Sequence, residues 1–324
     1  MPIAQPRALW TTDLAQQEDG QRVEVTEDSF EWWYFDTILD DGSTCVITFF
    51  SKVPFVPGPL SPILLLNISP PQGPYQQQQI FLPPASYSAS TTHCAVTMGP
   101  SWVTGDLRSY ELYAEADGLA AHLVLRDVVP GWRTGPFVPP ELAAQQPLAE
   151  QVVIPSGVAE GTLMYDGRLH RVTGSCYHDH QWGSARAWTA GVAGAKVTSW
   201  HWGRARAGDH AIVFAQVLGA VGGGPSEPIA VLFMLARGTR MTYDDDVTAL
   251  RVTPLDGGGD QGLTVEWTSN LGNVVLTLPS SKQIASLNDG GYRRFLSPAL
   301  LHSDHDGENV SSQGQAIWEI NVVP

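Results

Sequence analysis

The sequence predicts an all-β fold, made of two antiparallel domains of the barrel or sandwich type. Short runs of β-branched, aromatic and alternating residues recur along the chain, as expected of strands. Turn signals that contain glycine separate these runs, and helix-like composition is scarce. Closing such sheets into barrels also removes the exposed edges that so many strands would otherwise create.

The strand signal is clearest in eight runs of the chain. They are residues 44–51, 111–115, 121–126, 210–217, 229–235, 263–268, 273–278 and 316–322. The turn signals between strands are Asp41-Gly42, Asp117-Gly118, Asp166-Gly167, Asp289-Gly290 and the glycine runs 222–224 and 257–259. Only residues 140–151 have the composition of a helix, and Pro147 interrupts them.

The length of 324 residues fits two domains of about 150 residues each. The segment 189–197 is rich in small residues and lies between two tryptophan-rich segments, so we place the boundary there. The predicted domains are residues 1–190 and 191–324. The first twenty residues are polar and are expected to lie across the surface or to stay loose.

Composition limits the possible partners. Hydrophobic residues make up 43% of the chain, yet no apolar run approaches the roughly 18–20 residues of a membrane span. The net charge of −15 argues against a nucleic-acid partner and against an anionic membrane surface. This charge can serve simply to keep an apolar protein in solution, or it can steer a cationic ligand. A hydrophobic small molecule is the expected partner, and the sequence does not define the oligomeric state.

Three cysteines, Cys45, Cys94 and Cys176, do not make a disulfide framework; one pair could form, leaving one thiol. The N-terminus has neither a basic region nor a long apolar stretch, so a cytoplasmic location is expected. A secreted or luminal location is the alternative, weakly favoured by the glycosylation sequons at Asn67 and Asn309.

Three aromatic segments, at residues 31–36, 177–183 and 200–204, carry the functional interpretation. On a strand, alternate residues point to opposite faces. The first segment then presents Glu31, Trp33 and Phe35 on one face and Trp32, Tyr34 and Asp36 on the other. The second presents His178, His180 and Trp182 on one face and Tyr177, Asp179 and Gln181 on the other. Trp200, Trp202 and Arg204 alternate in the third.

Large flat apolar side chains with a few polar groups are typical of small-molecule pockets. The alternative is structural, because tryptophans can plug a barrel end and a buried histidine can simply satisfy a neighbour. His178 and His180 could hold one metal together with an aspartate, but the spacing indicates no third or fourth ligand, so no metal is predicted. Residues 302–307 fail the calcium-loop pattern and are interpreted as a polar turn.

Other catalytic signatures are missing from the sequence. It has no phosphate loop, no dinucleotide fingerprint and no nucleophile elbow. His93 and Cys94 are adjacent and would point to opposite faces of a strand, which does not make a nucleophile pair.

The aromatic segments resemble the carotenoid hydratase (hydroxyneurosporene synthase)-like superfamily, which includes AttH-type proteins and lipocalin-like Diels–Alderases of natural-product pathways. The resemblance rests on EWWYFD at 31–36, GSCYHDHQWG at 174–183 and SWHWGRA at 199–205, supported by VVIPSGVAEG at 152–161. It extends from about residue 31 to residue 206. It implies two lipocalin-like barrels, a cavity inside or between them, a hydrophobic polyene, polyketide or terpenoid substrate, and no cofactor.

The resemblance also assigns residues. His180 and Trp182 match the His-x-Trp unit of the hydratases. The best counterpart of their later Tyr-x-Asp unit is Phe214-Ala215-Gln216, which lacks both functional groups. Hydrating an isolated alkene requires a strong general acid, and Gln216 cannot protonate an alkene.

A cycloaddition requires no proton transfer, only two reacting ends held together and donors on a carbonyl. We therefore expect a cyclase, most concretely a Diels–Alderase or hetero-Diels–Alderase. An isoprenoid hydratase and a non-enzymatic lipocalin-type carrier are the alternatives. The expected catalytic residues are His180, Trp182, Gln216 and Tyr177. The expected substrate-binding residues are Glu31, Trp33, Phe35, Phe49, His178, Trp200, Trp202, Arg204 and Phe214.

Overall fold

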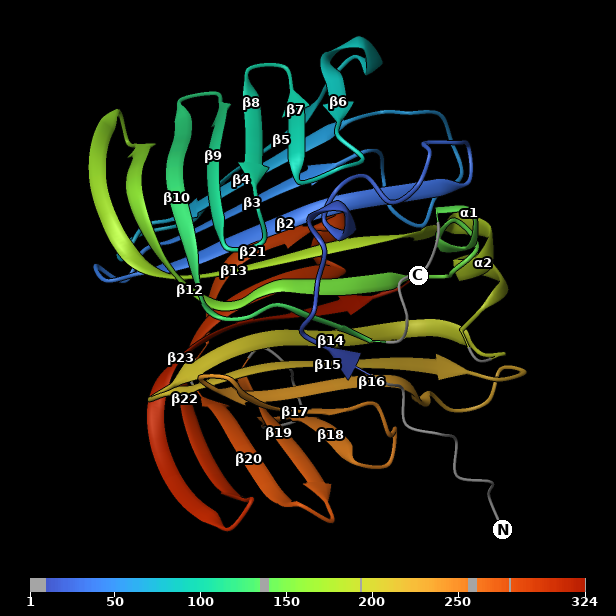
Figure 1. Cartoon of the computed structure of the whole chain (residues 1–324), viewed down its shortest axis with the longest axis vertical. Coiled ribbons are helices and arrows are strands. Elements are labelled where there is room, and N and C mark those ends of the chain that lie inside the picture. Colours follow the sequence, from blue (N-terminus) through green and yellow to red (C-terminus); the bar gives the residue numbers. More distant parts are fainter. Residues whose placement is uncertain (1–9, 135–139, 193, 256–260, 280, 324) are drawn as a thin grey trace. The chain divides into compact units, whose positions relative to one another are not determined.

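The computed structural model describes residues 10–134, 140–192, 194–255, 261–279 and 281–323 (Figure 1). The chain divides into two compact units, each with its own sheet and its own apolar core. The N-terminal unit comprises Thr11–Arg133 and Phe137–Gly191. The C-terminal unit comprises Val192–Pro324 and also takes in Trp10 and Thr134, which the sequence had placed with the first domain.

The first sheet has thirteen strands, joined in the order β5-β4-β3-β2-β13-β12-β10-β9-β8-β7-β6, with β11 paired to β12 and β1 to β11. Neighbouring strands run antiparallel. The strands are β1 (Trp10–Thr11), β2 (Ser29–Leu39), β3 (Thr44–Phe50), β4 (Ile63–Ser69), β5 (Gln76–Phe81), β6 (Tyr87–Ala89), β7 (Ala95–Met98), β8 (Ser101–Gly105), β9 (Ser109–Ala116), β10 (Leu119–Val129), β11 (Trp132–Thr134), β12 (Ala149–Tyr165) and β13 (Arg168–Ser184).

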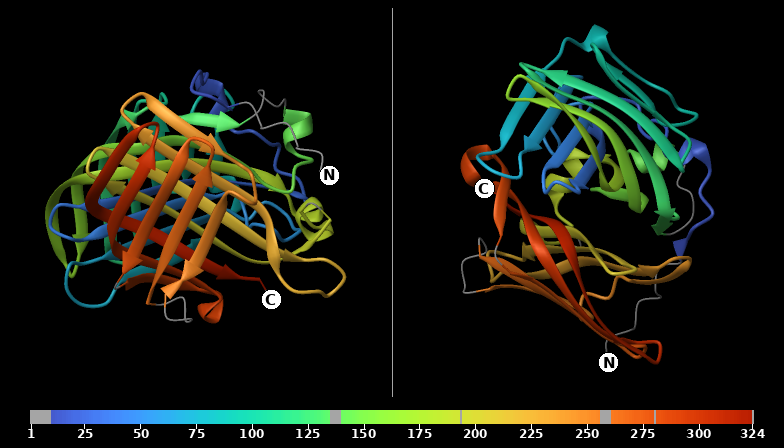
Figure 2. Two further views of the ribbon diagram at one scale, coloured as in Figure 1. Left: turned by 90° about the horizontal axis from the view of Figure 1, so that it is seen from below. Right: turned by 90° about the vertical axis from the view of Figure 1, so that its left-hand side faces the viewer.

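The second sheet has ten strands in the order β17-β16-β15-β14-β23-β22-β20-β19-β18, with β21 paired to β22. It is also antiparallel, and each sheet curls (Figure 2). The strands are β14 (Lys196–Ala207), β15 (His210–Ala220), β16 (Glu227–Arg237), β17 (Arg240–Asp244), β18 (Leu250–Pro254), β19 (Gly262–Ser269), β20 (Gly272–Pro279), β21 (Lys282–Leu287), β22 (Tyr292–His305) and β23 (Glu308–Val322). The all-β prediction is confirmed.

The described helices are short: η1 (Gln16–Glu18), η2 (Pro84–Ser86), α1 (Pro140–Ala143), α2 (Ala185–Ala190) and η4 (Asn288–Gly290). Of residues 140–151, whose helix-like composition is interrupted at Pro147, only Pro140–Ala143 form a described helix, and β12 begins at Ala149. Pro147 explains the early end, because its ring cannot continue a helical hydrogen-bond ladder. None of the described helices is both long and apolar enough to cross a membrane.

The predicted turns have the backbone that the sequence requires. Asp117-Gly118 and Asp166-Gly167 both adopt positive φ at both positions, as a two-residue hairpin turn demands. The glycine run 257–259 lies outside the described residues.

Strand alternation builds the core of the N-terminal unit. Trp33 and Phe35 of β2 point to the interior, where they join Cys45, Ile47 and Phe49 of β3. The prediction that the first aromatic segment divides its residues between two faces is confirmed, because none of Trp32, Tyr34 and Asp36 belongs to this cluster.

The core of the C-terminal unit follows the same rule. Phe214 lies fully buried among the inward residues of the second sheet. Gly203 is paired with Phe214 across β14 and β15, and a Cβ at Gly203 would lie 2.5 Å from the Phe214 ring. Glycine is therefore needed in the tryptophan-rich segment to admit this ring.

Candidate active site: a buried acid–histidine cluster

Four ionisable side chains meet inside the N-terminal unit. Asp19 follows η1, Glu31 lies on β2, and His178 and His180 lie on β13. The exposure of each of the four is 0%. The antiparallel register places His180 opposite Trp33 and His178 opposite Phe35, so the two strands fix both imidazoles beside the aromatic core. Buried charges of this kind persist only when they are paired.

His180 lies between two carboxylates. Its Nε2 is 2.8 Å from Glu31 Oε1, and its Nδ1 is 3.3 Å from Asp19 Oδ1. Burial alone would lower the pKa of His180, but the hydrogen bonds and charges of Asp19 and Glu31 outweigh burial and raise it. An imidazole that faces an acceptor at both nitrogens is satisfied best as the doubly protonated imidazolium.

Glu31 has further hydrogen bonds, one at its carboxylate and one at its main-chain N–H. The Arg22 N–H donates to Glu31 Oε1 at 2.5 Å, and the Glu31 N–H donates to Ser51 Oγ at 3.0 Å. Trp33 stacks on the His180 ring with a centroid separation of 4.5 Å. The carboxylate and the imidazole are therefore fixed in one geometry before any ligand binds.

His178 has a carbonyl on one side and a carboxylate on the other. Its Nδ1 lies 2.9 Å from the Tyr34 carbonyl oxygen, and its Nε2 lies 3.2 Å from Asp19 Oδ2. The Tyr110 hydroxyl donates to the same carboxylate oxygen at 2.5 Å. Burial alone would raise the pKa of Asp19, but the charge of His178 and hydrogen bonds from both histidines hold it well below its usual range.

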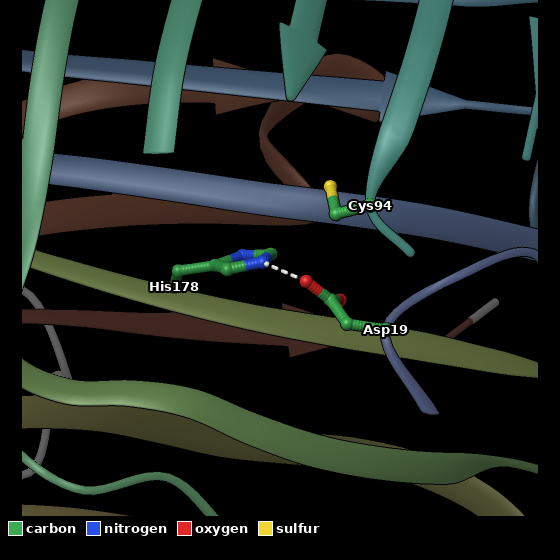
Figure 3. Close-up of side chains that lie close together, drawn as sticks. All are labelled: Asp19, Cys94 and His178. Carbon is green, nitrogen blue, oxygen red and sulfur yellow. Dashed lines mark hydrogen bonds and ion pairs between the residues drawn. The ribbon is translucent and has the colours of Figure 1, made fainter. Parts of the chain in front are cut away.

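Cys94 lies beside Asp19 and His178 (Figure 3). One ligand atom each from Asp19, Cys94 and His178 lie within 4.8 Å of one another. Burial, reinforced by the charge and hydrogen bond of Asp19, raises the pKa of the Cys94 thiol well above its ordinary value. Cys45 and Cys176 are also buried free thiols, so the disulfide that the cysteine count allowed is not formed.

Trp182 lies at the other end of the cluster. Its ring centroid is 5.1 Å from that of His180, and the Arg22 guanidinium lies 5.5 Å from the indole centroid. The indole is only 7% exposed, and its Nε1 has no hydrogen-bond partner among the described residues. A buried indole N–H without an acceptor is uncommon and is available to a ligand oxygen.

The structure brings together seven of the predicted site residues inside the N-terminal unit. They are Glu31, Trp33, Phe35, Phe49, His178, His180 and Trp182. Tyr177 is buried on the opposite face of β13, where its ring meets that of Tyr34 edge-on at 6.1 Å. Asp179 shares that face, as the sequence predicts, and so cannot join the two histidines in a metal site.

The other predicted residues belong to the C-terminal unit. Phe214 is part of its core, and the Gln216 amide donates to the Leu250 carbonyl at 3.3 Å. Trp200, Trp202 and Arg204 alternate with the inward-facing Ala205 and Ala207 of β14 and so lie on its opposite face. The predicted cavity between the two barrels stays a prediction.

A pocket of about 430 Å³ opens in the C-terminal unit, at the ends of the β16–β17 and β22–β23 hairpins. It contains none of the predicted site residues. Glu308 pairs with Arg237 at 2.5 Å and with Arg240 at 3.5 Å, so both cations at its rim have a carboxylate partner. The acid–histidine cluster is therefore the stronger candidate site.

Sequence reasoning missed Asp19 and Cys94. The first twenty residues were expected at the surface, yet Asp19 is fully buried; residues 1–9 lie outside the described part of the chain. The one available signal was Gly20. A Cβ there would lie 2.7 Å from the Thr91 carbonyl carbon, so glycine marks a close approach of this segment to the chain just before Cys94.

No protein-family model matches the chain. Solved structures nevertheless define its class: it has the two-barrel, lipocalin-like fold of the AttH and CghA proteins, as the sequence resemblance predicts. A putative AttH protein of Nitrosomonas europaea matches with a TM-score of 0.65 and 16% identity over 99% of each chain. CghA, crystallised with Sch210972, matches with a TM-score of 0.63 and 16% identity over 94% of each chain.

Kievitone hydratase of Nectria haematococca matches with a TM-score of 0.57 and 12% identity, over 94% of this chain and 97% of that one. Among characterised sequences, the quinolone epoxide rearrangement protein asqO of Emericella nidulans is 24% identical over 240 residues. That alignment covers 65% of this chain and 61% of the relative, so the chain spans less than two thirds of it.

Proposed function

We propose that this protein is an enzyme that cyclises or rearranges a hydrophobic natural-product intermediate. More specifically, we propose a [4+2] cycloaddition of the Diels–Alder or hetero-Diels–Alder type. One observation carries the proposal: the buried Trp182 indole N–H, without an acceptor, lies beside the Arg22 guanidinium and the fixed His180. The name of the relative asqO, a rearrangement protein, and the fold shared with CghA support it.

The proposed chemistry begins with a substrate oxygen bound at Trp182. An indole N–H and a nearby guanidinium stabilise negative charge that develops on a carbonyl or epoxide oxygen. Such donors act most strongly in a site that excludes water, and removing one costs about 10²–10³ in rate. Since Glu31 and Asp19 fix His180, and His180 packs on Trp182, the donor does not have to reorganise during the reaction.

Holding the reacting ends together supplies the rest of the rate enhancement. Restricting a flexible chain to a reactive fold can lower a barrier by about 7–11 kcal/mol in favourable cases. Trp33, Phe35 and Phe49 are buried in the core beside the two histidines, and we propose that the substrate packs against this aromatic core. His180 and Trp182 carry the proposal; Gln216 and Tyr177 stay predictions.

The test offers two probes to the purified full-length protein: a quinolone epoxide, and a linear polyene with a conjugated carbonyl dienophile. Product formation and stereochemistry are followed by chromatography and mass spectrometry. We expect Trp182→Phe to reduce kcat/KM by about 10²-fold, because phenylalanine keeps an aromatic ring but lacks the N–H. Trp102→Phe, a half-buried tryptophan on β8 outside the cluster, is the matched control and should retain full activity.

Other outcomes are distinguishable. If Trp182→Phe is folded and as active as the wild type, the indole donor has no role in the reaction. Incorporation of oxygen from ¹⁸O-labelled water into product would indicate a hydratase instead. Tight binding of both probes without turnover would indicate a lipocalin-type carrier.

A further inference from the structure

We propose that Asp19, Cys94 and His178 form a binding site for one zinc ion inside the N-terminal barrel. The three side chains come from segments far apart in the sequence, yet their ligand atoms lie within 4.8 Å of one another (Figure 3). This inference concerns a different end of the cluster from Trp182 and does not depend on the proposed reaction.

The hydrogen bond of His178 favours a metal at Nε2. Because Nδ1 lies 2.9 Å from the Tyr34 carbonyl oxygen, that nitrogen must carry a proton and donate it. A neutral His178 then has its lone pair on Nε2, which faces the Asp19 carboxylate at 3.2 Å. Either a proton on Nε2 or a metal ion between the two atoms satisfies this contact. A ring that donates Nδ1–H to a backbone carbonyl is also the usual arrangement of a metal-bound histidine.

The contacts of Asp19 fix its carboxylate. Its second oxygen, Oδ1, is fully buried and lies 3.3 Å from His180 Nδ1. The Tyr110 hydroxyl and the Trp33 indole both donate to Asp19, to its carboxylate and its carbonyl respectively, and so fix its orientation. A carboxylate held in one orientation by its neighbours is suited to ligation.

The donor set selects the metal. One thiolate, one imidazole and one carboxylate are ligands of zinc, whereas magnesium and calcium prefer oxygen alone. With zinc–ligand bonds of about 2.0–2.3 Å, the ligand atoms of a tetrahedral site lie roughly 3.3–3.8 Å apart. The 3.2 Å separation of His178 Nε2 from Asp19 Oδ2 already approaches this geometry. Three protein ligands leave the fourth position open.

Zinc binds cysteine as the thiolate and histidine through a deprotonated ring nitrogen, so binding of the ion would release protons from the ligands. The ion would join the segment after η1, the segment before β7 and the middle of β13.

The experiment uses the full chain produced in defined medium with either Zn²⁺ or Co²⁺. We expect about one metal ion per chain by elemental analysis. The cobalt form should show tetrahedral d–d absorption and a sulfur-to-cobalt charge-transfer band in the near ultraviolet. Cys94→Ser should lower metal affinity by more than about 10–100-fold, the loss caused even by residues that only orient ligands.

The matched control exploits the other two thiols. Cys45 and Cys176 are as buried as Cys94 and lie in the same core cluster, but outside the ligand set. The double variant Cys45→Ser/Cys176→Ser leaves Cys94 as the sole thiol and should retain the charge-transfer band. This control tests whether the Cys94 thiolate binds the metal even if Cys94→Ser does not fold. Less than about 0.1 metal ion per chain, or a cobalt form without the sulfur band, would overturn the proposal.

Discussion

Histidines in this protein occupy two contrasting buried environments. Carboxylates contact both nitrogens of His180 and raise its pKa despite burial. His201, on β14 of the C-terminal unit, is also buried, but burial is the one cause of its altered pKa, which is lowered to about 4. Its Nδ1 has no hydrogen-bond partner among the described residues. Burial without a counter-charge therefore keeps His201 neutral.

His201 should make the stability of the protein depend on pH. Its pKa is about 6.5 when unfolded and about 4 when folded, so between these values the unfolded chain binds more protons. This contribution is fully present above pH 6.5 and is lost as the pH falls towards 4, by about 3 kcal/mol. Urea unfolding of wild type and His201→Gln across pH 4–7 measures it. Parallel stability curves for the two proteins would contradict the prediction.

The part of the site that could be predicted at the residue scale is the part that lies on strands. Glu31, Trp33, His178 and His180 share one interior because side chains on a strand alternate, and this rule is local. Asp19 lies 159 residues from His178 in a turn without periodicity, so no local rule could place it there. The contact is purely tertiary, and only the glycine that follows Asp19 indicates it.

At the scale of elements, the turn after η1 positions the acid of the cluster. It packs against the segment before β7, with the Gln21 N–H donating to the Ser90 carbonyl at 2.7 Å. Gly20 allows this approach, because a side chain there would meet the Thr91 backbone at 2.7–2.9 Å. The position of Asp19 therefore depends on Gly20, a residue without a functional side chain.

Gly20→Ala tests this dependence. The added methyl group must displace backbone, so we expect a loss of about 1–3 kcal/mol in the free energy of unfolding. The displacement should also reduce metal binding at Asp19, if that site forms as proposed. Gly58→Ala is the control, since nothing lies within 4 Å of a Cβ at Gly58. Chemical denaturation of both variants measures the effect. If Gly20→Ala is as stable as Gly58→Ala, the turn accommodates the methyl group without a loss of stability.

At the scale of the whole molecule, strands and turns were predictable because their signals are local, whereas the extent of the helix within residues 140–151 was not. The composition of these residues favours a helix, but β12 begins at Ala149 and pairs with β13 along most of both strands. Tertiary pairing overrides weak helix propensity. That same pairing places Ala149 opposite Trp182, and so delimits the end of the barrel where the indole lies.

Because each unit has its own core, we expect a destabilising substitution in one unit to leave the other unit folded. All three cysteines, Cys45, Cys94 and Cys176, are buried in the N-terminal unit, so thiol labelling reports the opening of that unit alone. Gly203→Ala acts in the other unit, where its methyl group would lie 2.5 Å from the Phe214 ring. Overpacking of this kind costs about 1–3 kcal/mol.

We expect the Gly203→Ala variant to unfold at a lower urea concentration, followed by tryptophan fluorescence, while native-state thiol labelling keeps the wild-type rate. If labelling accelerates in step with the lost stability, the two units unfold as one cooperative body, and mutations in either barrel will disturb the cluster in the first.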